Sequence, residues 1–421
     1  MGFLEDLAAR RRFGMKPGLG TIRAVCAALG GPERRLRGVV HVAGTNGKGA
    51  VCALLDACLR AAGRKVARYT SPHLVRLNER FFLDGAPLAD AVLETASARV
   101  AEAARGCADL TFFEALTAVG FTAFADADPD YAVLETGLGG RLDATNICRP
   151  ALAVITRIGL DHCDWLGDTV EKIAVEKAGI VKPDVPVVLG RNVPSVVEIV
   201  KARARAVGAP FVYAPEIADE TEIPGGFSLA GAFNRENAVT ALAALKTLGV
   251  TSGIAEGFRQ VVWPGRFQRV GRFLVDGAHN PPAARALAAA LGEYAPFRGS
   301  VPTLIAGFCG DKDVDETLRI LAPLVRKGIA VRTNNPRSLD PAELARKMES
   351  AGIPSIPCDS IHLALEKLGS VPTKTGSVPT EGAVDALICG SLFLAGEALV
   401  ALGAYPWPAD RFDPAERLRP A

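Results

Sequence analysis

Gly44-Thr45-Asn46-Gly47-Lys48-Gly49 is the stretch that decides the fold, and it directly follows the apolar run Val39-Val40-His41-Val42-Ala43. A run rich in β-branched residues predicts a buried strand, and the glycine-rich turn leads into Val51-Cys52-Ala53-Leu54-Leu55, which suits a helix. In such a strand, loop and helix, backbone N–H groups converge at the helix N-terminus, where the helix dipole also favours an anion. Lys48 adds a full positive charge. The stretch therefore predicts a phosphate-binding loop.

This loop lacks the Ser or Thr that usually follows the lysine and ligates Mg²⁺. Gly49 and Ala50 occupy those positions. If phosphates bind here, ligands for the metal must come from elsewhere in the chain. A glycine-rich turn can also serve as a plain strand-to-helix corner, and the loop alone leaves that alternative open.

Bulk composition narrows the class of protein. The chain has 421 residues, which predicts two domains, and its 49% hydrophobic and 22% charged residues suit a soluble globular protein. A net charge of +2 gives no electrostatic footprint for nucleic acid or an anionic membrane. The start of the chain lacks a signal-peptide pattern, and no uncharged apolar stretch of about 18 residues occurs. The nine cysteines contain no CxxC pair and predict reduced thiols of a cytoplasmic enzyme.

Short apolar runs alternate with longer helix-like segments along the chain. Strands are expected at 39–43, 131–134, 151–155 and 185–189, with helices at 51–62, 88–104 and 114–125. After residue 270 the alternation resumes, with strands expected at 272–275, 303–306, 329–332 and 383–388 and helices at 282–294 and 318–325. This order predicts an α/β protein: a doubly wound, mainly parallel sheet that carries the phosphate loop, and a second, smaller α/β (Rossmann-like) domain. The turn residues Pro264-Gly265 place the boundary between domains 1–265 and 266–421.

One segment is a tandem repeat: Gly369-Ser370-Val371-Pro372-Thr373 recurs as Gly376-Ser377-Val378-Pro379-Thr380. A duplication of this composition predicts a surface loop without a function of its own.

Polar clusters follow three expected strands, at the edge where open α/β sheets bind their ligands. They contain Ser71, Glu135 and His162, which supply a hydroxyl, a carboxylate and an imidazole. Together these side chains could hold Mg²⁺ beside bound phosphates, although an imidazole ligand is unusual for this ion. Singly, each has a plainer explanation: Ser71 could cap a turn, Glu135 could pair with Arg141, and His162 could be a hydrogen-bonded loop histidine.

Two further groups could carry chemistry. Lys177 ends an amphipathic helix in Glu176-Lys177-Ala178-Gly179, where the alternative is a solvated lysine favoured by the helix dipole. Asp276, His279 and Asn280 lie in one turn between an expected strand and a helix that has proline in its first turn. A turn that only caps this helix is the alternative there.

Taken together, these motifs resemble the folylpolyglutamate synthase/dihydrofolate synthase branch of the Mur ligase superfamily, a group of ATP-dependent amide ligases. The resemblance runs from about residue 16 to residue 400. Its motifs occur in the order of that family: Gly44-Thr45-Asn46-Gly47-Lys48-Gly49, Ser71-Pro72-His73-Leu74, Asn78-Glu79-Arg80, Thr111-Phe112-Phe113-Glu114, residues 135–146, Asp161-His162, residues 176–180, Pro264-Gly265-Arg266, residues 276–281, Asp311-Lys312-Asp313 and Gly390-Ser391-Leu392.

The resemblance implies a role for each matched residue. The loop of Gly44, Thr45, Asn46, Gly47, Lys48 and Gly49 would hold the phosphates of ATP. Ser71, Glu135 and His162 would hold Mg²⁺, and Lys177 matches a lysine that becomes a carbamate and an anionic metal ligand. Asn237 and Arg266 would contact the nucleotide. Asp276 and His279 would contact ATP and glutamate. The segment Phe112-Phe113-Glu114 would lie near the pterin end of the folate. Two departures stand out: Ala50 replaces a usual Ser or Thr, and Phe233-Asn234 replace a frequent His-Gln.

The implied reaction adds L-glutamate to the carboxylate of dihydropteroate or a reduced folate, with ATP and Mg²⁺ and through an acyl phosphate. A monomer is expected, with hinge motion near residues 263–270 and His279 as the candidate general base. A cell-wall Mur ligase is the nearest alternative. A UDP-binding domain would be expected before its phosphate loop, whereas the loop here begins at residue 44, which argues against this alternative. A nucleotide switch without ligase activity, or an inactive binding protein, would need neither Lys177 nor the turn at 276–280.

Overall fold

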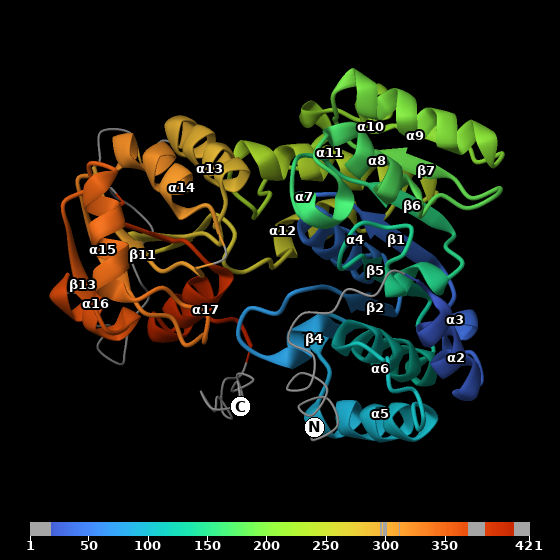
Figure 1. Cartoon of the computed structure of the whole chain (residues 1–421). Helices are drawn as coiled ribbons and strands as arrows, with labels where there is room; N and C mark the ends of the chain where they lie inside the picture. Colours follow the sequence, from blue (N-terminus) through green and yellow to red (C-terminus); the bar gives the residue numbers. More distant parts are fainter. Residues whose placement is uncertain (1–17, 295–296, 298–300, 311, 369–383, 408–421) are drawn as a thin grey trace.

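The computed structural model describes residues 18–294, 297, 301–310, 312–368 and 384–407. Two sheets lie in two lobes beside each other (Figure 1). The first lobe comprises residues 18–260, and the second lobe comprises the described residues from 268 on. The tandem repeat lies outside the described residues, so its prediction stays open.

The first lobe contains an eight-stranded sheet in the order β4-β3-β2-β5-β1-β6-β7-β8. Its strands are β1 (Val39–Ala43), β2 (Val66–Tyr69), β3 (Phe81–Leu83), β4 (Ala86–Pro87), β5 (Tyr131–Glu135), β6 (Leu152–Ile155), β7 (Val187–Leu189) and β8 (Phe211–Tyr213). β1 pairs in parallel with β5 on one side and with β6 on the other. Only β3 and β4 add antiparallel pairings, so the predicted mainly parallel sheet is confirmed.

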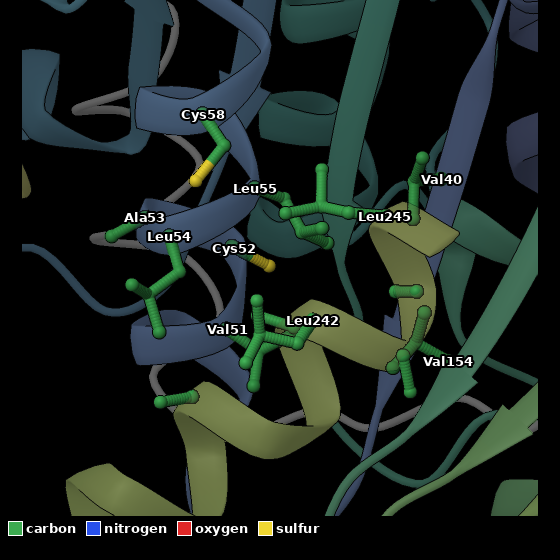
Figure 2. Packing of buried hydrophobic residues seen from close by; sticks show 14 of the residues in the cluster. Val40, Val51, Cys52, Ala53, Leu54, Leu55, Cys58, Val154, Leu242 and Leu245 are labelled. Carbon is green, nitrogen blue, oxygen red and sulfur yellow. The ribbon is translucent and has the colours of Figure 1, made fainter. Parts of the chain in front are cut away.

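Helices cover both faces of this sheet. They are α2 (Gly20–Ala28), α3 (Pro32–Arg35), α4 (Lys48–Ala61), α5 (Asp90–Ala103), α6 (Phe112–Ala127), α7 (Cys163–Leu166), α8 (Val170–Ala178), α9 (Pro194–Ala206), α10 (Ala214–Ile217), α11 (Ala232–Thr247) and α12 (Ile254–Gln260). Because successive strand residues point to opposite faces, Val40 of β1 packs with α4 and α11, whereas Val39 packs with α2 and α6. Figure 2 shows the first of these cores, in which Val51 of α4 lies beside Leu242 of α11.

The second lobe repeats the architecture with six strands in the order β13-β12-β11-β14-β10-β9. The strands are β9 (Gln268–Val270), β10 (Phe273–Val275), β11 (Thr303–Ala306), β12 (Lys327–Val331), β13 (Ser355–Cys358) and β14 (Ala386–Cys389), and only β9 is antiparallel. Its helices are α13 (Pro281–Glu293), α14 (Val314–Leu321), α15 (Pro341–Ser350), α16 (Ile361–Lys367) and α17 (Leu392–Ala401). The helix expected at 318–325 begins earlier, because Asp313 caps α14 by accepting a hydrogen bond from Glu316 N.

One segment of the first lobe enters the core of the second. Leu74 and Val75, in the loop between β2 and β3, are buried in a cluster with Leu394 and Ala395 of α17. The two lobes are therefore joined by apolar packing as well as by the chain at residues 261–267. In the part of the chain that the structure describes, no helix is both long and apolar enough to cross a membrane.

Candidate active site

The predicted phosphate loop lies where β1 ends and α4 begins. Its backbone is held from the neighbouring strand, because Thr45 N and Asn46 N both donate to Arg157 O and Thr156 Oγ1 donates to Asn46 O. Gly47 has a φ of +85°, and a Cβ there would lie 2.0 Å from Asn237 Oδ1, so only glycine fits. The loop is thus a fixed cradle for an anion at the N-terminus of a 14-residue helix.

Trp263 accounts for the missing hydroxyl after the lysine. A Cβ at Gly49 would lie 2.1 Å from Cζ2 of the Trp263 ring. The indole therefore occupies the space into which a Ser or Thr at this position would project. The sequence showed that the residue was absent, but only the structure names the side chain that excludes it.

Lys48 and Lys177 meet at one backbone oxygen. Lys48 Nζ donates to Gly44 O at 3.1 Å and to Thr45 O at 3.3 Å, while Lys177 Nζ donates to Gly44 O at 2.6 Å. Both amines therefore reach the start of the phosphate loop, one from α4 and one from α8. The sequence predicted both residues as site residues, and the structure brings them together.

Lys177 is a buried amine. The residue is only 4% exposed, which excludes the solvated lysine considered from the sequence. Burial first, and the charge of Lys48 second, lower the pKa of its ammonium from 10.5 to about 7. A large fraction of Lys177 is then neutral near pH 7, and a neutral amine is the form that can react with CO₂.

Glu135 and Ser71 lie on the other side of the loop. Glu135 ends β5, is 4% exposed, and accepts a hydrogen bond from Ser71 N through Oε2 at 3.1 Å. Burial raises the pKa of its carboxyl, while the charge of Lys48 opposes that rise. The alternative pairing of Glu135 with Arg141 is wrong, because Arg141 bonds to Glu176 instead.

The donor set here fits Mg²⁺ in part. Glu135 and the adjacent hydroxyl of Ser71 are oxygen donors of the kind that Mg²⁺ prefers, and a cation would compensate the buried carboxylate. The described residues contain no group of three or more His, Cys, Asp or Glu side chains able to hold a metal. A metal here would therefore need oxygens from a bound phosphate, or an anionic Lys177, to complete its shell.

His162 stands apart from Ser71 and Glu135. It occupies the N-cap of α7 with a φ of +50°, and its imidazole lies 3.8 Å from Asp161 Oδ2. Burial lowers the pKa of its ring, the charge of Asp161 opposes that change, and the charges of Lys312, Lys48 and Lys177 lower the pKa further. The imidazole is thus within electrostatic range of both loop lysines, but no contact joins it to the predicted metal ligands within the described residues.

The second lobe contributes charged side chains from two short turns. Asp276 is 6% exposed and accepts from Phe267 N and Ala278 N, both at 2.7 Å. Arg266 is near enough to Asp276 and Glu135 for both carboxylates to favour its charged form. The guanidinium of Arg266 therefore links the second lobe electrostatically to the carboxylate beside the phosphate loop.

His279 and Asn280 share the turn that begins at Asp276. His279 Nδ1 lies 2.8 Å from Gly277 O, which directs that nitrogen to the backbone, and burial lowers the pKa of the ring. Asn280 caps α13 by accepting from Ala283 N, so the capping role considered from the sequence is right for this residue. It does not account for Asp276 or His279.

Asn237 lies on α11 against the phosphate loop. It is 9% exposed, and its Oδ1 is the atom that a Cβ on Gly47 would strike. Its Nδ2 lies 3.4 Å from Oδ1 of Asn234, one of the two residues that depart from the family pattern. The structure thus places Asn237 at the predicted nucleotide site, through contact with the loop.

Asp143 lies in the motif at residues 135–146, in which the sequence alone does not distinguish it from its neighbours. Its carboxylate is 5% exposed and accepts from Thr145 N, Thr145 Oγ1 and Leu138 N. Thr145 Oγ1 also lies 2.8 Å from Nε2 of the fully buried His41. A buried acid held in this way in the loop after β5 is a candidate site residue, and its position in a glycine-rich motif was the available signal.

Two protein-family descriptions match the chain. The Mur ligase middle domain matches residues 42–206, and the Mur ligase, glutamate ligase domain matches residues 265–374. The chain is also 36% identical over 377 residues to the dihydrofolate synthase/folylpolyglutamate synthase of Mycobacterium tuberculosis, covering 78% of this chain and 77% of that protein. The chain belongs to the folylpolyglutamate synthase/dihydrofolate synthase family of Mur ligases.

A second relative agrees with this assignment. The Escherichia coli dihydrofolate synthase/folylpolyglutamate synthase is 38% identical over 364 residues, which cover 82% of this chain and 83% of that protein. The family resemblance and the class of ATP-dependent ligase expected from the sequence are confirmed. The expected α/β fold class is confirmed by the solved structures of the family.

Solved structures of the family include complexes with nucleotides and other ligands. Escherichia coli FolC in complex with DHPP and ADP has a TM-score of 0.82 at 31% identity, covering 96% of this chain and 97% of that chain. A bifunctional folylpolyglutamate synthase/dihydrofolate synthase with Mn, AMPPNP and L-glutamate bound has a TM-score of 0.78 at 30% identity, covering 96% and 97%. The expectation of an adenine nucleotide and a divalent metal as cofactors is confirmed for the family.

Proposed function

We propose that this chain joins L-glutamate to the carboxylate of dihydropteroate or a reduced folate in a reaction driven by ATP. The observation that supports this most is the meeting of Lys48 and Lys177 at Gly44 O, with Glu135 in electrostatic range of Lys48 and of Arg266 in the segment between the lobes. A carboxylate is a poor electrophile, so it first takes the γ-phosphoryl group as an acyl phosphate. The amine of glutamate then displaces phosphate and forms the amide.

The residues act mainly by holding charge in place. We assign Gly44, Thr45, Asn46, Gly47, Lys48 and Gly49 to the phosphates of ATP, whose negative charge the loop N–H groups and the Lys48 ammonium would stabilise. Arg266 would reach the same phosphates from the second lobe, and Asn237 would contact the nucleotide beside Gly47. When bound, Mg²⁺ would neutralise phosphate charge and help align the reacting oxygens.

Ser71, Glu135, His162 and Lys177 are our candidates to hold that metal. Lys177 would do so as a carbamate, which forms when its neutral amine attacks the carbon of CO₂ and the nitrogen loses a proton. This step replaces a lysine side chain that can carry a positive charge with an anion at the start of the phosphate loop. It also removes the energetic cost of burying a charged ammonium at Lys177 near Lys48.

In this proposal, Asp276 and His279 act where the amine of glutamate attacks the acyl phosphate. His279 has its Nδ1 on Gly277 O, so Nε2 is the nitrogen left to accept a proton from the glutamate ammonium. Asp276 holds the turn through Phe267 N and Ala278 N. Phe112 and Phe113 begin α6, and the Phe113 ring lies against Gly137, which follows β5. These two aromatic side chains would face the pterin end of the substrate.

Other assignments extend the proposal. We place the domain boundary at 265/266, giving domains 1–265 and 266–421, because each sheet lies on one side of it. A monomer that binds small molecules is expected from the family resemblance, and the near-neutral net charge of +2 argues against nucleic acid or a membrane surface as a partner. A cytoplasmic location is expected because all nine cysteines are free thiols.

Glutamate-dependent release of phosphate from ATP tests the function. The assay compares dihydropteroate with tetrahydrofolate as the acceptor, and Lys48→Ala serves as the control. Turnover with both acceptors identifies a bifunctional synthase, and turnover with one identifies a single activity. ATP hydrolysis that does not depend on glutamate or on either acceptor would refute the proposal and favour a nucleotide switch.

A further inference from the structure

The end of the described chain returns from the second lobe to the first. After α17, residues 404–407 run back to the loop between β2 and β3, and Figure 1 shows this red segment beside the blue loop. Tyr405 OH donates to Glu79 Oε1 at 2.6 Å. Two residues on, the Trp407 ring meets Phe82 edge-on, with ring centroids 5.1 Å apart.

Glu79 is the residue that shapes this loop. Its buried carboxylate accepts from Leu74 N, Val75 N and Arg76 N at 2.6–2.7 Å, and the Tyr405 hydroxyl adds a fourth donor. A buried carboxylate must be compensated by hydrogen bonds, so the loop backbone wraps around it. Tyr405 supplies the one side-chain donor among these four and comes from the other lobe.

The same loop begins with a proposed metal ligand. Ser71 lies eight residues before Glu79 in the sequence and donates its N–H to Glu135 Oε2. Hydrogen bonds also join the two ends of the loop, because Thr70 N donates to Arg80 O and Thr70 Oγ1 donates to Glu79 O. The loop therefore contacts Glu135 at its first residue, and its last residues are held by the hydrogen bonds of Glu79, one of which comes from Tyr405.

We propose that Tyr405 is a positioning residue: by bonding to Glu79 from the second lobe, it holds the loop that places Ser71 beside Glu135. This inference rests on the proposed function, because it assigns Ser71 and Glu135 to the metal–nucleotide site. The loop would then keep Ser71 beside Glu135 only while the second lobe holds Tyr405 against Glu79. Trp407 supports the contact by packing on Phe82, which also lies under the Arg68 guanidinium at 3.9 Å.

Tyr405→Phe tests this inference, with Tyr213→Phe on the edge strand β8 as the matched control. Calorimetry would measure the affinity for AMPPNP with and without Mg²⁺, using the full chain. We expect Tyr405→Phe to weaken binding about tenfold in the presence of Mg²⁺, the loss of one hydrogen bond to a charged group. Binding without Mg²⁺, which depends on the Lys48 loop, should not change.

Hydrogen exchange gives a second readout that requires no ligand. The amides of Leu74, Val75 and Arg76 should exchange faster in Tyr405→Phe than in the wild type or Tyr213→Phe. In a Glu79→Gln background the same substitution should have a smaller effect, because the neutral amide offers Tyr405 a single, weaker acceptor oxygen in place of the carboxylate.

Four outcomes decide between the explanations. Weaker Mg²⁺-dependent binding together with faster exchange supports the positioning role. Unchanged binding overturns it, whatever the exchange shows, because Tyr405 would then only brace the lobes. If the wild type bound no AMPPNP, the proposed function would fail, and unchanged exchange in Tyr405→Phe would separately refute the link to the loop.

Discussion

Lys48 and Lys177 donate to the same carbonyl oxygen, that of Gly44, from two different helices. Two ammonium groups this close repel each other, and the burial of Lys177 increases that cost. The arrangement is stable if Lys177 gives up its proton or becomes an anion, and an anion bound in the loop would also relieve the repulsion. The strain between these two lysines thus points to the chemistry of the site, and it makes the first prediction.

Lys177 should make the stability of the protein depend on pH. Its pKa is about 7 in the folded protein against 10.5 for a free lysine, so between these values the unfolded chain holds a proton that the folded chain has lost. Stability must therefore rise with pH across this window, by up to about 1.4 kcal/mol per pH unit, and level off below pH ~7. Urea unfolding from pH 6 to 10 in CO₂-free buffer should show this rise in the wild type relative to Lys177→Met.

The control for that experiment is Lys172→Met on the same helix. Lys172 is exposed and pairs with Asp168, so its loss should leave the pH profile parallel to that of the wild type. Equal slopes for Lys177→Met and the wild type would contradict the low pKa.

Carbamylation of Lys177 is the second prediction. Protein equilibrated with ¹³C-bicarbonate near pH 8 should show a carbamate carbon signal by NMR, since much of the amine is neutral there. The signal should be missing from Lys177→Met and present in Lys172→Met. Synthase activity should fall after CO₂ is removed and return with bicarbonate. A wild-type spectrum without the carbamate signal would rule out this form of the metal site.

The sequence predicted most of the framework because the framework follows from local patterns. The limits of β1 and β11 agree with the expected strands, since both are continuous apolar runs bounded by turn residues. The edge strands β4, β8, β9 and β13, and β3 next to an edge, were not predicted. Their two to four residues carry too little periodicity, and pairing with a neighbour rather than local preference creates them.

The site divides in the same way. Lys48, Glu135 and Asp276 were found because each lies at the carboxyl end of a strand or shortly after it, where the fold itself brings polar side chains together. Trp263 and Tyr405 could not be found, because they act through contacts with Gly49 and Glu79, residues more than 200 positions away in the sequence. A single sequence contains no signal for contacts of this range.

Restoring the usual hydroxyl after Lys48 should harm the protein. In Gly49→Ser the new Cβ would lie 2.1 Å from the Trp263 ring, and we expect the free energy of unfolding to fall by about 1–3 kcal/mol. Ala50→Ser is the matched variant, because it adds only an oxygen to a Cβ already present. It should fold normally and could gain up to about tenfold in AMPPNP affinity through one charge-assisted hydrogen bond. Thermal unfolding and calorimetry of the two variants would show the contrast, and a stable, tight-binding Gly49→Ser would contradict it.

Asp276→Asn should weaken both the fold of the second lobe and the reaction. The two carboxylate oxygens accept from Phe267 N and Ala278 N, and Phe267 has a φ of +50° that this hydrogen bond helps to hold. An amide can accept at one of these positions only, and at the other its NH₂ would face a backbone N–H, at a cost of about 1–3 kcal/mol. Arg266 would at the same time lose the carboxylate that does most to favour its charged form, so the affinity for ATP should fall. Urea unfolding and phosphate release would measure the two effects beside Asp359→Asn, an exposed acid of the same lobe. If Asp276→Asn matched that control in both measurements, Asp276 would have no role in shaping the site.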